Sequence, residues 1–280
     1  YAETRRVFQT QEEPLDRQES IQAFQESALD QLESDLPDRQ AADLQQIWQD
    51  LGEDFFLRPT TPEIVSLSKR LLEHGDNTTA FVGLSAPQTG AADEGATKIY
   101  VLDQDRPKTF AALVVTLSQL GLTVVDAYIS RASSDRYFDM FTVLDEDGTE
   151  VSDPALRDGI VDRVKATLAN PEPATSGATQ RVSRQLKELK VPASVSLTAQ
   201  EDDLTAVLNV TASDRPGLLA NIALVLVELG LEITSARITT LGERVEDVFL
   251  VTRADGQSLN DAQQCYDIEQ AIRQRLDQAL

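Results

Sequence analysis

The chain has 280 residues, of which 41% are hydrophobic and 26% charged, a composition typical of soluble globular proteins. A formal net charge of −22 argues against nucleic acid as a partner, because phosphate binding requires clustered Lys and Arg. No apolar run reaches the ~18–20 residues that span a bilayer, so no membrane contact is expected. The single cysteine, Cys265, excludes an internal disulfide and a multi-cysteine zinc site. We therefore expect a protein of the reducing cytoplasm.

Residues 1–75 are expected to be helical, because apolar side chains recur there at spacings of three and four. Two such stretches are Ile21, Phe24, Ala28, Leu29 and Leu32, and Leu44, Ile47, Trp48 and Leu51. A third helix is predicted to begin at Pro62, with Thr61 as its N-cap. These helices have too few residues to bury their apolar faces, and the chain begins at Tyr1 without Met. We expect a C-terminal piece of a longer protein whose least stable part is residues 1–75, with a protease-resistant fragment starting near Ala96.

Residues 76–96 are rich in Gly, Ser, Thr and Ala and are predicted to be a linker. After them, one pattern occurs twice. Asp105-Arg106-Pro107-Lys108 returns as Asp214-Arg215-Pro216-Gly217, and the same frame continues through Leu120-Gly121-Leu122 and Leu229-Gly230-Leu231. After a slip of one residue, Asp139-Met140-Phe141 matches Asp247-Val248-Phe249. A repeat of this length indicates two copies of one module.

The copies are predicted at residues 97–170 and 198–280, joined by a linker and edge strand at 171–197. In the first copy, a strand near Ile99 precedes a helix at 107–121, strands at 122–132 and 136–144, and a helix at 153–169. In the second copy the order is strand 204–211, helix 216–229, strands 231–241 and 244–252, and helix 258–279. Val195-Ser196-Leu197 could close the first sheet or pair with strand 204–211. The expected fold class is α+β, a helical segment followed by two ferredoxin-like βαββαβ domains.

The Asp214–Gly217 turn is the strongest candidate for a ligand site. Pro216 suits the first helical position, and Asp214 could accept from the free N–H groups of the helix start. Gly217 permits close backbone approach at the positive helix end, where a carboxylate-bearing ligand could bind. The alternative is a capped turn with no ligand. In the first copy, Lys108 replaces the glycine, so its amides should be less accessible and the two turns should differ.

The residues needed for several kinds of catalysis are not found in the sequence. His74 is the single histidine, too few for a metal-dependent phosphohydrolase of the His-Asp type, and it suits a helix end. The pairs Asp103/Asp105 and Asp145/Asp147 are interpreted as turn residues rather than magnesium ligands. No phosphate loop, dinucleotide glycine pattern or nucleophile elbow occurs. We expect no catalysis by this chain alone and no cofactor within it.

The repeated strand–helix–strand–strand–helix order with its Asp-Arg-Pro-Gly turn resembles the ACT domain, a small amino-acid-binding module. Residues before the repeat resemble the segment that precedes tandem ACT domains in the bifunctional uridylyltransferase/uridylyl-removing family of bacterial nitrogen control. They are Pro14-Leu15-Asp16-Arg17, Trp48, Phe55-Phe56-Leu57-Arg58, Pro62-Glu63 and Leu71-Leu72-Glu73-His74. The chain departs from the family pattern at Ser66-Leu67-Ser68 and at Lys108.

The resemblance implies a glutamine-sensing region of an enzyme that adds UMP to the signal protein P-II and removes it. Both catalytic domains, and the Mg²⁺ of the full enzyme, would lie outside this chain, with the catalytic domains as partners in cis. Candidate glutamine-binding residues are Asp214, Arg215, Pro216, Gly217 and Leu218, together with Asp105, Arg106 and Pro107. Lys108 disfavours the first turn. The alternatives are a free-standing tandem-ACT regulator and an ACT pair that serves only for dimerisation.

Overall fold

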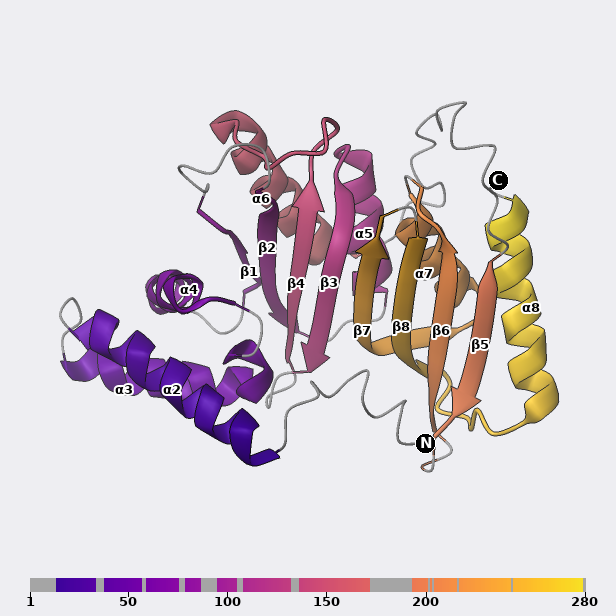
Figure 1. Cartoon of the computed structure of the whole chain (residues 1–280), viewed down its shortest axis with the longest axis horizontal. Coiled ribbons are helices and arrows are strands. Elements are labelled where there is room, and N and C mark those ends of the chain that lie inside the picture. The colour runs from indigo at the N-terminus through magenta and orange to yellow at the C-terminus, as the bar shows by residue number, and fades with distance from the viewer. Residues whose placement is uncertain are drawn as a thin grey trace.

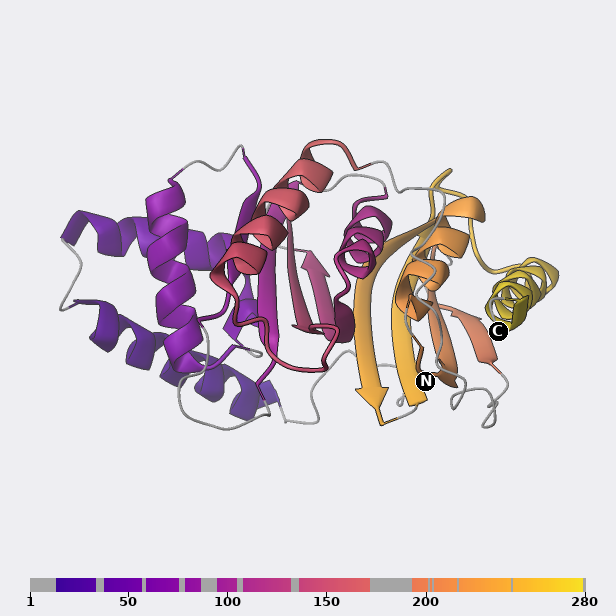
Figure 2. The same cartoon turned by 90° about the horizontal axis from the view of Figure 1, so that it is seen from above.

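The computed structural model describes residues 14–33, 38–56, 59–75, 79–86, 95–104, 108–131, 136–171, 193–200, 202, 204–215, 217–242 and 244–278. In these residues a helical segment lies at one end of a broad antiparallel sheet, and further helices cover the face of the sheet turned away from the viewer in Figure 1. Figure 2 shows the helical segment and the two halves of the sheet in a row along the longest axis. None of the described helices is long and apolar enough to cross a membrane.

The helical segment consists of α2 (Pro14–Glu33), α3 (Asp38–Leu51), the 3₁₀ turn η1 (Glu53–Phe56) and α4 (Thr61–His74). The N-cap of α4 is Thr60, one residue earlier than predicted, because the carboxylate of Glu63 accepts from the Thr60 backbone N–H at 2.7 Å and closes the first turn. At the other end, Gly75 has a φ of 61°, the left-handed conformation that often ends a helix.

Two units with the same order of elements follow. The first contains β1 (Phe81–Leu84), β2 (Thr97–Gln104), α5 (Thr109–Gln119), β3 (Thr123–Arg131), β4 (Arg136–Leu144) and α6 (Pro154–Ala169). The second contains β5 (Ser194–Ala199), β6 (Thr205–Ser213), α7 (Leu218–Glu228), β7 (Leu231–Leu241), β8 (Arg244–Arg253) and α8 (Ala262–Gln278). The α+β class with ferredoxin-like units is confirmed. In each unit the fourth strand, β1 or β5, is the first element in chain order rather than the last.

The segment 76–96, predicted to be a linker, contains a strand, and the edge strand predicted within 171–197 is β5. β1 lies inside the segment 76–96 and pairs antiparallel with β2, so this segment is not all linker. The segment is rich in Gly, Ser and Ala, and only a short stretch of it, Phe81–Leu84, forms the strand. β5 pairs with β6 through Val195 with Val210 and Leu197 with Leu208, which resolves the open question of its partner. The second unit thus begins at residue 194 rather than 198.

The strands form one sheet in the order β1-β2-β4-β3-β7-β8-β6-β5, so β3 and β7 join the two units (Figure 1). Ala127 pairs with Ile238, and Ile129 pairs with Ala236. Tyr128 pairs with Arg237, which is its own equivalent in the second copy of the repeat. The junction is consequently a pseudo-two-fold axis through this residue pair, as in a symmetric dimer formed within one chain.

The face of the sheet turned toward α5, α6, α7 and α8 carries the larger hydrophobic core, which runs without interruption through both units. On the opposite face, the described residues form a second hydrophobic core at the first unit. There the helical segment packs on Tyr100, Leu102, Phe138 and Met140, and the Phe55 and Phe138 rings meet edge to face at 5.3 Å. The expectation that these helices need a partner absent from this chain is wrong for the described residues, because the first unit supplies one.

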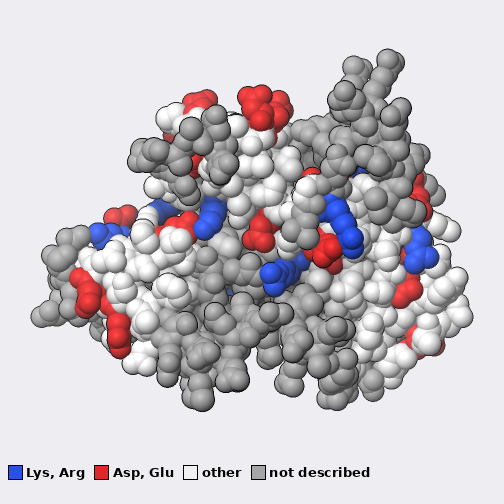
Figure 3. All heavy atoms as spheres, viewed as in Figure 1, with Lys and Arg blue, Asp and Glu red and all other residues white. Residues whose placement is uncertain are grey.

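The repeat equivalents of these four residues explain why the helices pack on one unit and not the other. Tyr100 pairs with Met140 and Leu102 with Phe138, whereas the matching pairs in the second unit are Asn209 with Val248 and Thr211 with Glu246. Polar side chains there are solvated at little cost, and burying them without partners would be unfavourable. In Figure 3 the described surface at the second-unit end is mostly uncharged, and Lys and Arg are interspersed with Asp and Glu on this face of the molecule.

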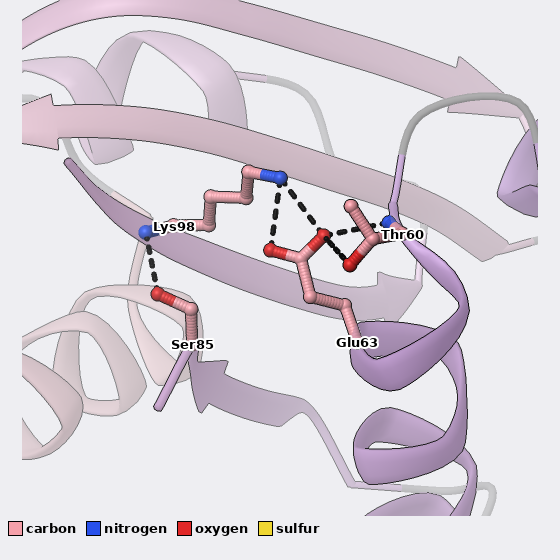
Figure 4. A network of polar contacts seen from close by, with 4 residues as sticks. All are labelled: Thr60, Glu63, Ser85 and Lys98. Carbon is pink, nitrogen blue, oxygen red and sulfur yellow. Dashed lines mark hydrogen bonds and ion pairs between the residues drawn. The ribbon is translucent and has the colours of Figure 1, made fainter. Parts of the chain in front are cut away.

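A polar cluster also attaches α4 to the sheet (Figure 4). The Lys98 ammonium lies 2.8 Å from Glu63 Oε1, with both side chains mostly buried, and the Ser85 hydroxyl accepts from the Lys98 backbone N–H at 3.0 Å. Burial opposes ionisation of Glu63, but hydrogen bonds from Lys98 and Thr60 outweigh it and lower the pKa of the carboxyl. Arg70, two turns along α4, donates to the carbonyl of Leu84 at 2.9 Å.

Phe138→Ala is expected to release the helical segment from the sheet. Truncating a buried Phe costs about 3–5 kcal/mol, and here the lost contacts belong to the helix–sheet boundary. Hydrogen exchange should therefore accelerate in α2, α3 and α4 while β6 and α7 stay protected. The matched control is Glu246→Ala at the equivalent exposed position, which should leave exchange unchanged. Equal acceleration in both units by Phe138→Ala would contradict this packing.

Candidate functional site

The junction between the units creates two cavities that are related by the repeat. At each, the start of one unit's first helix faces the end of the other unit's first helix and the strand after it, because α5 packs against α7 beside the β3–β7 pair. We call them the Lys108 cavity and the Gly217 cavity, after the residue at the helix start.

The Lys108 cavity has a volume of about 310 Å³. Its lining comes from the first unit through Lys108, Thr109, Phe110, Ala111 and Tyr137, and from the second through Ala223, Leu226, Val227, Leu231, Glu232, Ile233, Thr234 and Thr252. The Thr234 hydroxyl is held by a hydrogen bond to the carbonyl of Leu250 at 3.1 Å. Ligand pockets typically measure roughly 300–1,000 Å³, so this cavity has room for a small metabolite.

The Gly217 cavity is much smaller, at about 40 Å³. The second unit lines it with Asp214, Arg215, Gly217, Leu218, Leu219, Ala220, Ile238, Thr240, Val245 and Asp247, and the first unit with Val114, Ser118, Leu122, Thr123 and Val124. A water molecule needs roughly 10–15 Å³ of such volume, so the space holds only a few waters as it stands. A larger ligand would require the turn to move.

The structure describes four of the predicted site residues in the second turn and at the start of α7. Asp214, Arg215, Gly217 and Leu218 all line the Gly217 cavity. Pro216, and Asp105, Arg106 and Pro107 of the first turn, lie outside the described residues. The sequence reasoning missed the residues that the partner unit contributes, such as Glu232 and Ser118, because they are far from the turn in the chain. Asp247 could have been identified from the sequence, because an aspartate occupies the same position, Asp139, in the first copy of the repeat.

Both helix starts leave backbone N–H groups without a side-chain cap. Lys108 and Gly217 have φ values of 70° and 76° and occupy the N-cap positions of α5 and α7, and no side chain caps either helix. Asp214 was expected to cap α7, but it precedes the cap residue Gly217, and its carboxylate accepts from the backbone N–H of Arg215 instead. In α7 the N–H of Leu218 donates instead to the backbone carbonyl of Arg215 at 3.1 Å. The positive end of each helix dipole still favours a negatively charged ligand group.

The Gly217 cavity is lined by two carboxylates, Asp214 and Asp247, and by Arg215. Asp247 is 2% exposed, and its Oδ1 accepts from the Thr239 backbone N–H at 3.3 Å. Burial raises the pKa of Asp247 to about 7, and the nearby Asp214 carboxyl contributes to this rise. Burial also raises the pKa of Asp214. Arg215 donates from Nη2 to the carbonyl of Leu276 at 2.6 Å, near the C-terminus of α8.

The aspartate pairs considered as metal ligands have a structural role where they are described. Asp145 Oδ1 accepts from the backbone N–H groups of Asp147 and Thr149, at 3.1 and 2.8 Å, and so fixes the turn after β4. Across the described part of the chain, no group of three or more His, Cys, Asp or Glu side chains could hold a metal ion.

Comparisons with known proteins agree with this architecture. A family model described as "ACR family N-terminal ACT domain" matches residues 201–278, and one described as "Uridylyltransferase GlnD fifth domain" matches residues 16–68. The bifunctional uridylyltransferase/uridylyl-removing enzymes of Pseudomonas putida (strain W619) and Pseudomonas aeruginosa (strain LESB58) are 38% and 35% identical to this chain over 284 residues. Each alignment covers 99% of this chain and 31% of the relative.

The chain is homologous to the C-terminal part of the bacterial bifunctional uridylyltransferase/uridylyl-removing enzymes. It is thus a regulatory ACT region that spans 31% of the length of these relatives. Among solved structures, aspartate kinase from Synechocystis has a TM-score of 0.36 and 18% identity, covering 64% of this chain and 27% of that one. The ACT family match at residues 201–278 falls on the second sequence-predicted module, and the first module has the same order of elements.

Asp247→Asn should change how the stability of the ACT region depends on pH. Because burial raises the folded-state pKa of Asp247 above its ordinary value of 3.8, the folded chain holds a proton that the unfolded chain releases between about pH 4 and 7. Wild-type stability should therefore fall as pH rises through this window, by up to about 1.4 kcal/mol per pH unit. The neutral Asn removes this dependence, so the variant should be the more stable protein at pH 8. Urea denaturation from pH 4 to 8 measures it, and parallel profiles for the two proteins would refute the prediction.

Proposed function

We propose that this chain is the glutamine-sensing regulatory region of an enzyme that uridylylates and deuridylylates the signal protein P-II. The homology to bifunctional uridylyltransferase/uridylyl-removing enzymes over 99% of the chain supports the regulatory assignment. The cavities between the ACT units support small-molecule binding, and their uncapped helix starts suit a carboxylate.

The observation that carries the proposal is the Lys108 cavity, with its volume of about 310 Å³ between the two ACT units. It provides polar groups at Thr109, Glu232, Thr234 and Thr252 and an apolar wall that includes Phe110 and Leu226. Such a lining suits an amino acid with a short methylene chain and polar ends. The glycine of the second turn favours the Gly217 site, whereas the cavity volumes favour the Lys108 site, and both are proposed as binding sites.

A conformational change caused by ligand binding at the junction would be transmitted to the helical segment through the first ACT unit, on which that segment packs. Glutamine shifts an activity balance only if it binds one arrangement of the two units better than another. β2 carries Lys98 near its start, where the ammonium forms an ion pair with Glu63 of α4, and it ends at Gln104, four residues before Lys108 in the chain. A shift of β2 caused by a ligand at Lys108 would therefore also move Lys98, which holds α4 through Glu63.

Sheet extension, the basis of the dimerisation-only alternative, is disfavoured because helix side chains occupy edge backbone groups. On β5, the backbone N–H of Leu197 donates to Glu269 Oε1 at 2.7 Å, and the carbonyl of Val195 accepts from Arg273 at 3.3 Å. At the other edge, the carbonyl of Leu84 accepts from Arg70. Covered edges resist pairing with another strand.

Calorimetric titration of the chain with L-glutamine should show saturable binding. Gly217→Val should weaken binding at the second turn, by about 1–3 kcal/mol if glutamine's carboxylate loses a buried hydrogen bond there. The matched change is Lys108→Val at the first turn, and comparing the two variants ranks the sites. If the wild-type chain binds neither glutamine nor any other amino acid, the sensor proposal fails.

The isolated chain should neither transfer UMP to P-II nor remove it. The basis is the single histidine and the lack of a phosphate loop in the sequence. Radiolabelled UTP and purified P-II with Mg²⁺ or Mn²⁺ provide the assay, with the uridylylated form of P-II as substrate for removal. Turnover that a point substitution within this chain abolishes would show that the chain has catalytic residues of its own.

A further inference from the structure

The two cavities are equivalent by repeat position but differ in charge. In the Lys108 cavity, Lys108 of the first unit and Glu232 of the second unit line the same space. The repeat frame that aligns Asp105 with Asp214 places Gly217 and Thr123 at the corresponding positions of the Gly217 cavity. A cation and an anion, one from each unit, are therefore found at these two positions of the Lys108 cavity. The same two positions are uncharged in the Gly217 cavity, whose charged lining residues are Asp214, Arg215 and Asp247.

The backbone at Lys108 points to a functional reason for the cation. Lys108 has a φ of 70° and is the non-glycine residue with positive φ in the described chain. The left-handed conformation is strained for a lysine and easy for the glycine that the second copy has at this position. Lys108 lines the cavity in this strained conformation, although the second copy of the repeat has the unstrained glycine at the same position. Strain of this kind supports a hypothesis of function.

We infer that Lys108 and Glu232 bind the α-carboxylate and the α-ammonium of one amino acid and thereby determine specificity for a zwitterion in the Lys108 cavity. This inference rests on the proposed amino-acid sensing. Charge-assisted hydrogen bonds to both ends of the ligand are stronger than neutral ones and fix its orientation. The apolar side chains of Phe110, Leu226 and Leu231 then face the carbon chain between those ends.

The assignment makes the site depend on both ACT units. Lys108 is at the start of α5, and Glu232 is the second residue of β7, the strand that pairs with β3 across the junction. An amino acid held at both ends connects the two units and favours the arrangement in which the charges are correctly spaced. The Gly217 cavity, which lacks this pair, should bind the same ligand more weakly.

Three ligands separate the two roles in calorimetric titrations of the whole chain. They are L-glutamine, glutaramate, which lacks the α-ammonium, and 4-aminobutanamide, which lacks the α-carboxylate. Glu232→Gln should reduce glutamine affinity at least tenfold and leave glutaramate affinity unchanged. Lys108→Gln should reduce glutamine affinity by a similar factor and leave 4-aminobutanamide affinity unchanged. Thr123→Ala, the matched change in the other cavity, should have less than a twofold effect.

The exchange variant Lys108→Glu with Glu232→Lys tests pairing without removing either charge. It should recover part of the affinity that the single reversals Lys108→Glu and Glu232→Lys lose, and thermal unfolding of each variant shows that it is folded. Glutamine binding by wild type that survives both Gln substitutions within twofold overturns the inference and leaves the sensor proposal standing. A loss of glutamine affinity in Thr123→Ala that exceeds the losses in Lys108→Gln and Glu232→Gln also overturns the inference. A wild-type chain that binds no amino acid overturns both.

Discussion

The antiparallel pairing of β3 with β7 is the interaction on which the rest of the structure depends. It joins two repeats into one sheet about the Tyr128–Arg237 pair and brings α5 against α7 on the inner face. Both cavities exist only because of this junction, since each takes its lining from both units. A ligand in either cavity must therefore respond to the relative position of the two units, which is the physical requirement for an allosteric sensor.

Within this pseudo-symmetric frame, the two copies have diverged in ways that change their roles. The outer face of the first unit carries Tyr100 and Phe138 and is buried by the helical segment, whereas the second unit has Asn209 and Glu246 at the same positions. The first unit is consequently a sheet buried on both faces, with its helices attached through Glu63 and Lys98. The first unit thus both lines the Lys108 cavity and holds the helical segment.

The electrostatics of the two cavities have diverged as well. The large cavity combines Lys108 with Glu232, where the small cavity has Gly217 and Thr123. The small cavity also holds Asp214, Arg215 and Asp247, and burial raises the pKa of the two carboxyls. Because solvation is poor at such sites, these differences in charge have larger effects than they would on the open surface. Two sites formed by one repeat are therefore expected to differ in affinity and in pH dependence.

The sequence by itself determined the repeat frame, the α+β class and most element boundaries, because these depend on local periodicity and turn chemistry. The predicted strands 136–144 and 231–241, for example, coincide with β4 and β7. It also placed Asp214 and Gly217 at a helix start. Only the tertiary structure decided that β5 pairs with β6, that the helical segment packs on the first unit, and that Glu232 lines the cavity at Lys108. These relations join residues far apart in the chain, and their stability comes from burial and pairing across the junction, which local patterns do not specify.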